Sequence, residues 1–267
     1  MNIVVCVKYV PDAQADRGFE AGDSTTERVS VEGRLSELDE YAVEEALKIV
    51  EAGNADGGGQ VTVLTMGPEQ ATDAIKRALQ MGAHAGVHVS DEAIAGSDSI
   101  ATSLVLAKAV QKIGEGGTVD LVLTGMASTD GVMSVVPAML AERLALPQVT
   151  YAAELTVEDG RVRIRRDGDA STQEVTASLP ALVSVTDQIN EPRYPSFKGI
   201  MAAKKKPVQT WGIADLGIDP AQVGLGAAWT VVESVTTRPP RQAGQIVKDD
   251  GDGGLKLAEY LITHKFV

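Results

Sequence analysis

The chain has 267 residues, of which 44% are hydrophobic and only 4% aromatic, so Ala, Val, Leu and Ile must form most of its core. Its formal net charge of −13 disfavours nucleic-acid binding, and its single cysteine, Cys6, excludes an internal disulfide and a cysteine-based metal cluster. Because it has neither an apolar leader nor a run of roughly 20 apolar residues, we expect a cytoplasmic protein that is not embedded in a membrane.

Strands and helices alternate along the first half of the chain. Residues 2–8 form a valine-rich run that predicts a buried strand, and the polar stretch 16–33 predicts a loop or loose hairpin. Apolar residues at helical or strand spacing then predict helix 39–52, strand 60–66, helix 69–81, strand 86–89, helix 98–113, strand 119–124 and helix 134–144. Asp39 is expected to cap the first of these helices. The alternation predicts an α/β fold with a Rossmann-like, mostly parallel sheet covered by helices.

Added antiparallel strands are expected after Pro147. Segments 149–157 and 161–166 flank Glu158-Asp159-Gly160, which is typical of a hairpin turn. Strands 173–178 and 181–186 follow, and we expect this half to extend the sheet.

The periodicity fades from Pro207 onward. Residues 239–254 are typical of a linker, and 255–266 predict a short amphipathic helix that cannot fold alone. We therefore expect a nucleotide-binding α/β domain over residues 1–206 and an extended C-terminal arm over residues 207–267.

Ligands of parallel sheets bind beyond the carboxyl ends of the strands. The informative ends are Cys6-Val7-Lys8, the helix start Ser36–Asp39, Thr65-Met66-Gly67 and the loop Thr124–Gly131. The last has the features of an anion cradle: Gly125 and Gly131 allow close backbone approach, Ser128 and Thr129 offer hydroxyls, and free amides open the helix from about Ser134. The same residues also fit an ordinary capped helix start.

No catalytic or metal-binding set is predicted. His84 and His88 have the i, i+4 spacing of a helical metal site, but Gly82 and Gly86 argue against a helix there. Cys6 lies in or at the end of a buried strand, which favours an inert core thiol.

The stretch Asp187–Lys206 has an unusual composition. Prolines and a glycine break any regular element, yet Tyr194, Phe197, Ile200 and Met201 are large and apolar. Exposing such side chains costs roughly 1.5–3 kcal/mol each, so either the body of the protein covers them as a lid or a partner does. Ile200–Lys206 predicts a short helical turn with a cationic end.

Here the chain resembles a known family. Asn190-Glu191-Pro192-Arg193-Tyr194, followed by Ile200-Met201-Ala202-Ala203-Lys204-Lys205-Lys206, resembles the signature of the electron transfer flavoprotein β subunit of bacterial heterodimers. Val7–Asp12, Ala42–Ala46, Asp167-Gly168 and Leu179–Ala181 are similar to that family in its order and spacing. The resemblance implies an electron carrier without bond-making chemistry. With an α subunit, it would take electrons through FAD from flavin dehydrogenases, such as acyl-CoA dehydrogenases, to a quinone reductase.

The resemblance also implies a structural AMP at the strand ends, with FAD held mainly by the α subunit. The nucleotide site falls on Cys6, Ser36, Asp39, Met66, Gly125, Met126, Ser128, Thr129, Asp130, Gly131, Val132, Met133 and Ser134. Two positions depart from the family: Ser36-Glu37 replaces a common Asn-Pro, and Met126 replaces a lysine, although Asp130 is kept.

For residues 187–206 the resemblance implies a recognition loop that docks onto dehydrogenases. The partner-binding residues would be Tyr194, Pro195, Ser196, Phe197, Lys198, Ile200 and Met201, with Phe197 at an anchor position where leucine is expected. The C-terminal arm would pack on the α subunit.

Two alternatives stay open. One is a stand-alone adenine-nucleotide-binding or hydrolysing α/β protein, although Tyr9–Asp12 lacks a phosphate-binding turn. The other is an electron-bifurcating relative with a second FAD in place of AMP.

Overall fold

The computed structural model describes residues 1–267 apart from 16–17, 29, 54–57, 237, 241–243 and 245. The chain forms two units, Met1–Glu233 and Ser234–Val267. A seven-stranded sheet in the order β12-β5-β4-β1-β6-β11-β7 is the centre of the first unit, and each neighbouring pair is parallel. The strands are β1 (Asn2–Cys6), β4 (Gln60–Met66), β5 (Ala85–Val89), β6 (Leu121–Gly125), β7 (Gln148–Ala152), β11 (Ala181–Val185) and β12 (Val208–Trp211).

Helices cover both faces of this sheet. Successive side chains of β1 point to opposite faces: Ile3 and Val5 pack in a core with α1 and α2, and Val4 packs in a second core with α3 and α4. The helices are α1 (Glu37–Ala52), α2 (Thr72–Met81), α3 (Ser99–Glu115) and α4 (Val136–Leu144). Their buried residues recur at helical spacing, as the sequence predicted. The expected α/β Rossmann-like fold is confirmed.

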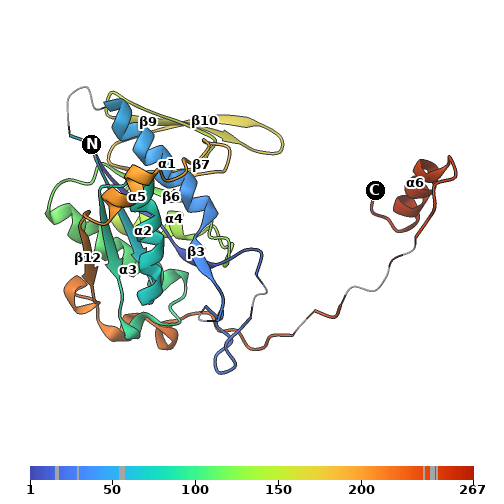
Figure 1. Ribbon diagram of the computed structural model, residues 1–267, viewed down its shortest axis with the longest axis horizontal. Coiled ribbons are helices and arrows are strands. Elements are labelled where there is room, and N and C mark those ends of the chain that lie inside the picture. Colours follow the sequence, from blue (N-terminus) through green and yellow to red (C-terminus); the bar gives the residue numbers. More distant parts are fainter. Residues whose placement is uncertain (16–17, 29, 54–57, 237, 241–243, 245) are drawn as a thin grey trace. The chain divides into compact units, whose positions relative to one another are not determined.

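The smaller sheets differ from the expectation. The hairpin at Glu158-Asp159-Gly160 is confirmed, but segment 149–157 divides at Ala153 into β7 and β8. With β8 (Glu154–Glu158), strands β9 (Arg161–Asp167) and β10 (Thr172–Ser178) form a separate antiparallel sheet, seen as the long ribbon β9–β10 in Figure 1. The polar stretch before α1 lies between β2 (Tyr9–Pro11) and β3 (Gly33–Leu35), which pair in antiparallel orientation, and a bridge between Phe19 and Thr26 agrees with a loose hairpin.

This half extends the main sheet and adds antiparallel strands, as expected, but through different strands: β7 and β11 join the main sheet in parallel, whereas the antiparallel strands β8–β10 form a sheet of their own. All five residues of β11 are buried, which is the pattern of a strand covered on both faces. The separate sheet β8–β10 acts as the connection between β7 and β11, and that connection allows the two strands to run in the same direction.

Residues 207–233, expected to begin the arm, lie within the first unit. Val208–Trp211 pairs in parallel with β5 and forms one edge of the sheet, a strand too short to produce a clear sequence pattern. The second unit contains α6 (Gly253–Thr263), where Tyr260 and His264 stack with ring centroids 4.1 Å apart. None of the residues of α6 is buried.

Candidate functional site

The carboxyl ends of three predicted strands lie side by side. Met66, Cys6 and Gly125 are the last residues of β4, β1 and β6, which are consecutive in the sheet. The chain continues from β1 to β4 and β5 on one side and returns to β6 on the other. The strand order therefore reverses between β1 and β6, and ligands of open parallel sheets bind at such a reversal.

Asp39 joins the start of α1 to two of these strand ends. It does not cap the helix as expected, because Ser36 occupies the N-cap position. Asp39 is instead buried, and its Oδ2 accepts a 2.8 Å hydrogen bond from the amide of Lys8. Burial raises the pKa of Asp39 to about 7, against the opposing effects of Lys8 and of the Gly125 amide. A Cβ at Gly125 would lie 2.6 Å from Asp39 Oδ1, so glycine is needed for this close approach.

Asp130 forms ion pairs with two residues that are distant from it in the sequence. Its Oδ1 lies 2.9 Å from Lys8 Nζ, and its Oδ2 lies 2.6 Å from Arg28 Nη2. Burial alone would raise the pKa of Asp130, but the charge of Lys8 and hydrogen bonds from Ser128, Lys8 and Arg28 hold it well below its usual range. The cations of Lys8 and Arg28 therefore lie beside the loop that carries Met126, the position at which a lysine was expected from the resemblance.

The loop between Asp130 and α4 has an unusual backbone. Val132 and Ser134 adopt left-handed conformations, with φ of 51° and 58°, and the side chains of Val132 and Met133 are exposed. Helix α4 begins at Val136 rather than at Ser134, and no side chain caps its first turn. Pro137 has no amide hydrogen, so the amides of Val136 and Ala138 are the ones that can donate to an anion. Met126 and Thr129 are half-buried in the same loop.

Three buried hydroxyls near the carboxyl ends of the strands lack hydrogen-bond partners among the described residues: Ser36 Oγ, Thr65 Oγ1 and Thr124 Oγ1. A buried polar group without a partner costs about 1–3 kcal/mol. Hydroxyls, free helix amides and the cations beside Asp130 form the type of donor set that suits the ribose and phosphate of a nucleotide. The residues at the strand ends therefore have the chemistry to bind a phosphorylated ligand.

The second candidate site is the surface made by the loop before α5 and by α5 itself (Phe197–Ala203). Tyr194 and Phe197 are 89% and 81% exposed, and Ile200 and Met201 are also exposed. Within the chain these side chains do not form a lid. The helical turn expected over Ile200–Lys206 begins earlier, because the Ser196 hydroxyl accepts the Gly199 amide at 3.0 Å and caps α5.

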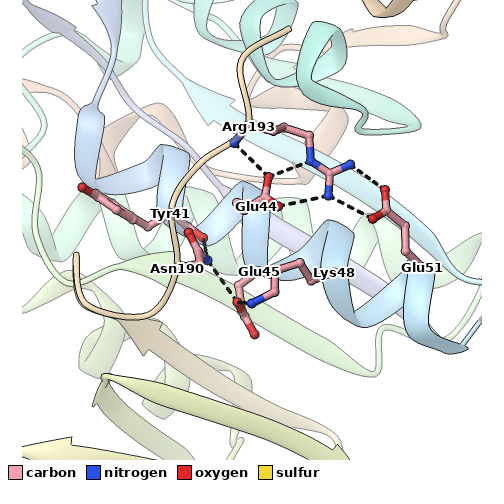
Figure 2. Close-up of polar contacts among 7 residues, drawn as sticks. All are labelled: Tyr41, Glu44, Glu45, Lys48, Glu51, Asn190 and Arg193. Atoms are coloured by element: carbon pink, nitrogen blue, oxygen red, sulfur yellow. Dashed lines mark hydrogen bonds and ion pairs between the residues drawn. The ribbon is translucent and has the colours of Figure 1, made fainter. Parts of the chain in front are cut away.

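Two residues of the predicted signature fix this loop to α1 (Figure 2). Arg193 lies between Glu44 and Glu51, and Asn190 donates to the Tyr41 carbonyl and to Glu45. The exposed aromatics are therefore carried by a loop that is anchored to the main body of the first unit.

Sequence reasoning missed several of these relationships. Arg28 lies in a polar stretch with no motif, and nothing in the sequence pairs it with Asp130 across 102 positions. The burial of Glu44 and Glu45 against the loop was not predicted either. Their position on the inner face of an amphipathic helix, beside buried Val43 and Ala46, was the available signal.

The histidine pair makes hydrogen bonds within the first unit, and the lone thiol lies at the end of β1. His84 Nδ1 accepts the Val61 amide at 3.1 Å, whereas buried His88 contacts the carbonyls of Gly67 and Pro68. Burial, with the nearby Asp39 charge, raises the pKa of Cys6 to about 12, so the thiol stays protonated. Over the described part of the chain, no helix combines the length and apolar character needed to cross a membrane.

Comparison with known proteins identifies the family. Residues 24–216 match the model of the electron transfer flavoprotein domain. The electron transfer flavoprotein subunits beta of Mycobacterium leprae and Mycobacterium tuberculosis are 47% and 46% identical over 267 residues, covering 100% of this chain and 99% of each relative. The chain belongs to the family of electron transfer flavoprotein β subunits.

A further relative comes from another type of complex. The subunit CarD of the caffeyl-CoA reductase-Etf complex of Acetobacterium woodii is 34% identical over 247 residues, covering 92% of each chain. Family membership assigns this chain to electron transport, and a β subunit implies an α-subunit partner.

Proposed function

We propose that this chain, together with an α subunit, carries electrons through FAD from flavin dehydrogenases, such as acyl-CoA dehydrogenases, to a quinone reductase. It would perform no bond-making chemistry itself and would act in the cytoplasm. The observation that carries the proposal is the exposed pair Tyr194 and Phe197 on an anchored loop. Exposed aromatics on a fixed support suit a partner with an apolar pocket, because such anchors dominate interface energies.

The nucleotide in this proposal is a structural AMP at the ends of β4, β1 and β6. Its support is the set of unpartnered hydroxyls of Ser36, Thr65 and Thr124, and the uncapped start of α4. The residues that would hold it are those of the strand ends and of the loop Gly125–Ser134. FAD would lie mainly on the α subunit, with this chain lining one side.

The second unit has the composition of an arm that packs on that α subunit. Leu255, Leu257 and Ile262 are exposed on α6, and a short helix of this kind is marginal without a surface to cover its apolar face. The α subunit is the partner that a β subunit implies.

The test is co-expression with the α subunit. A yellow 1:1 complex that an acyl-CoA dehydrogenase reduces in the presence of its substrate is the expected result. Colourless subunits that elute separately would contradict the proposal, and ATP turnover by the isolated chain would favour a stand-alone nucleotide hydrolase.

Extraction of the bound cofactors tests the nucleotide. One FAD and one AMP per heterodimer are expected. Two FAD molecules per heterodimer would mean that a second flavin takes the place of AMP, as in an electron-bifurcating complex.

A further inference from the structure

The loop directly before the exposed aromatics is attached to helix α1. We propose that Arg193 and Asn190 are positioning residues, which hold the loop on α1 so that Tyr194 and Phe197 meet a dehydrogenase in a fixed orientation. This inference rests on the proposed docking function and adds to it the residues that set the geometry of docking.

Arg193 makes a double fork with two carboxylates of α1 (Figure 2). Its Nε and Nη2 lie 2.7 and 3.0 Å from the two carboxylate oxygens of Glu44, and its Nη1 and Nη2 lie 2.6 and 2.9 Å from those of Glu51. Glu44 and Glu51 are about two helical turns apart on one face of α1. The guanidinium is therefore fixed in position and in plane, because paired donors restrict rotation as well as distance.

Asn190 provides a second attachment on the same helix. Its Nδ2 lies 3.0 Å from the Tyr41 carbonyl and 3.0 Å from Glu45 Oε2, and Lys48 Nζ lies 3.1 Å from the same Glu45 oxygen. Tyr41 and Glu51 are separated by roughly 15 Å along α1. Because the loop contacts α1 at two places that far apart, it cannot rotate about a single contact.

We call the contacts of Asn190 and Arg193 with α1 the Asn190–Arg193 clamp. Burial distinguishes it from a surface ion pair. The side chains of Glu44 and Glu45 are only 8% and 6% exposed, although both are carboxylates. A buried carboxylate needs a partner, so removing Arg193 or Asn190 while the loop still covers α1 would leave a buried charge without full compensation. The amide of Arg193 also donates to Glu44 Oε2 at 3.2 Å, which ties the backbone itself to the helix.

The far end of α5 is fixed to a different helix. Lys206 Nζ lies 2.9 Å from the Leu79 carbonyl and 3.0 Å from that of Gly82, at the end of α2. A Cβ at Gly199 would lie 2.5 Å from the Gln80 carbonyl, so α5 approaches α2 closely. The exposed aromatics therefore lie between two supports, and the Asn190–Arg193 clamp is the one directly before Tyr194.

A preorganised surface lowers the ordering cost of association. Loosening the clamp should therefore weaken docking without changing the electron transfer of the docked complex. The variant is Arg193→Lys, which keeps a cation beside Glu44 but loses the fork. The matched control is Arg77→Lys: Arg77 lies 2.8 Å from Glu40 on the same helix α1, and its side chain is 34% exposed against 33% for Arg193.

The first measurement uses the heterodimer and the acyl-CoA dehydrogenase that reduces it fastest. For Arg193→Lys we expect the KM for the heterodimer to rise about tenfold with kcat unchanged, whereas Arg77→Lys should leave both unchanged. Glu51→Gln should raise KM in the same direction by a smaller factor, because it removes only the exposed half of the fork. Equal KM values for Arg193→Lys and wild type would overturn the proposal.

The second measurement needs no dehydrogenase. A spin label on Lys198→Cys reports the motion of α5, and labelling of the wild-type chain measures any reaction at Cys6, its single cysteine. In the labelled full-length chain combined with its α subunit, Arg193→Lys should increase the fast-motion component of the spectrum and Arg77→Lys should not. An unchanged spectrum would refute the clamp even if dehydrogenases dock, and a changed spectrum would support it even if the proposed partner is wrong.

Discussion

The amide of Lys8 donates a 2.8 Å hydrogen bond to the buried carboxylate of Asp39, and this bond links the end of β1 to the first turn of α1. The same lysine reaches Asp130 with its Nζ at 2.9 Å. Two acidic side chains near the carboxyl ends of β1 and β6, Asp39 and Asp130, thus both contact Lys8. Burial acts to raise the pKa of both groups, but at Asp130 the charge of Lys8 and hydrogen bonds from Ser128, Lys8 and Arg28 together outweigh it, so the two pKa values move in opposite directions.

Asp39 should make the stability of the chain depend on pH. Its pKa is about 7 in the folded chain, mainly through burial, against an ordinary value of 3.8. Between these values the folded state binds the extra proton, so the free energy of unfolding falls as pH rises from about 4 to about 7 and is then constant. The loss is at most roughly 4 kcal/mol. Cys6 stays neutral in this range, and Asp130 stays charged.

The measurement is urea unfolding of wild type and Asp39→Asn at pH 5, 6, 7 and 8. The asparagine cannot ionise, so its stability should lack this decline. Curves that run parallel across the four pH values would show that Asp39 does not titrate there.

Asp130→Asn should lower stability by a nearly constant amount between pH 5 and 8. The side chain of Asp130 is only 3% exposed and bridges Lys8 and Arg28, and losing charge-assisted hydrogen bonds costs about 2 kcal/mol. Because its pKa is held below the ordinary value, the stabilisation is complete above that value and is lost only in stronger acid.

The matched control is Glu37→Gln, which removes an exposed ion pair with Arg34 at 3.8 Å and should change stability by less than about 1 kcal/mol. Thermal melting of wild type, Asp130→Asn and Glu37→Gln measures the two losses of stability. Equal effects of the two substitutions would mean that burial of Asp130 contributes nothing.

The elements with a strong period were predictable from the sequence. Strand Gln60–Met66 has the predicted bounds, and Asp98 caps α3 where the predicted helix began. Strand β11 shows where local reasoning fails: the hairpin beside it led us to expect an antiparallel strand, but its five buried residues belong to a parallel one. Which neighbour a strand selects depends on contacts between distant segments, which periodicity does not record.

The same limit applies to the sites. The strand ends Cys6, Met66 and Gly125 could be predicted because topology alone brings them together. The pairing of Arg193 with Glu44 joins residues 149 positions apart, and its geometry depends on how the loop folds back over α1. The residue types were visible in the sequence, but the partner of each charge was not.

Removing the second unit should separate folding from subunit pairing. A chain that ends at Glu233 keeps the whole seven-stranded sheet and both cores. We expect its melting temperature to match that of the full-length chain alone, whereas co-purification with the α subunit should be greatly reduced. Undiminished pairing would show that residues 234–267 are not the arm that packs on the α subunit.

Phe197→Ala tests the docking surface itself. Phe197 is 81% exposed at the first position of α5, and Ser196, not Phe197, provides the cap, so truncation removes almost no buried contact. Folding, α-subunit pairing and FAD content should therefore stay intact. An aromatic anchor that fills a partner's pocket contributes about 2 kcal/mol, which corresponds to a roughly 30-fold weaker electron transfer from the dehydrogenase. The measurement is dehydrogenase-dependent FAD reduction beside thermal melting, with Phe19→Ala as control, because Phe19 is 51% exposed outside this surface. If Phe197→Ala transfers electrons at the wild-type rate, or if its melting temperature collapses, Phe197 is not the docking anchor.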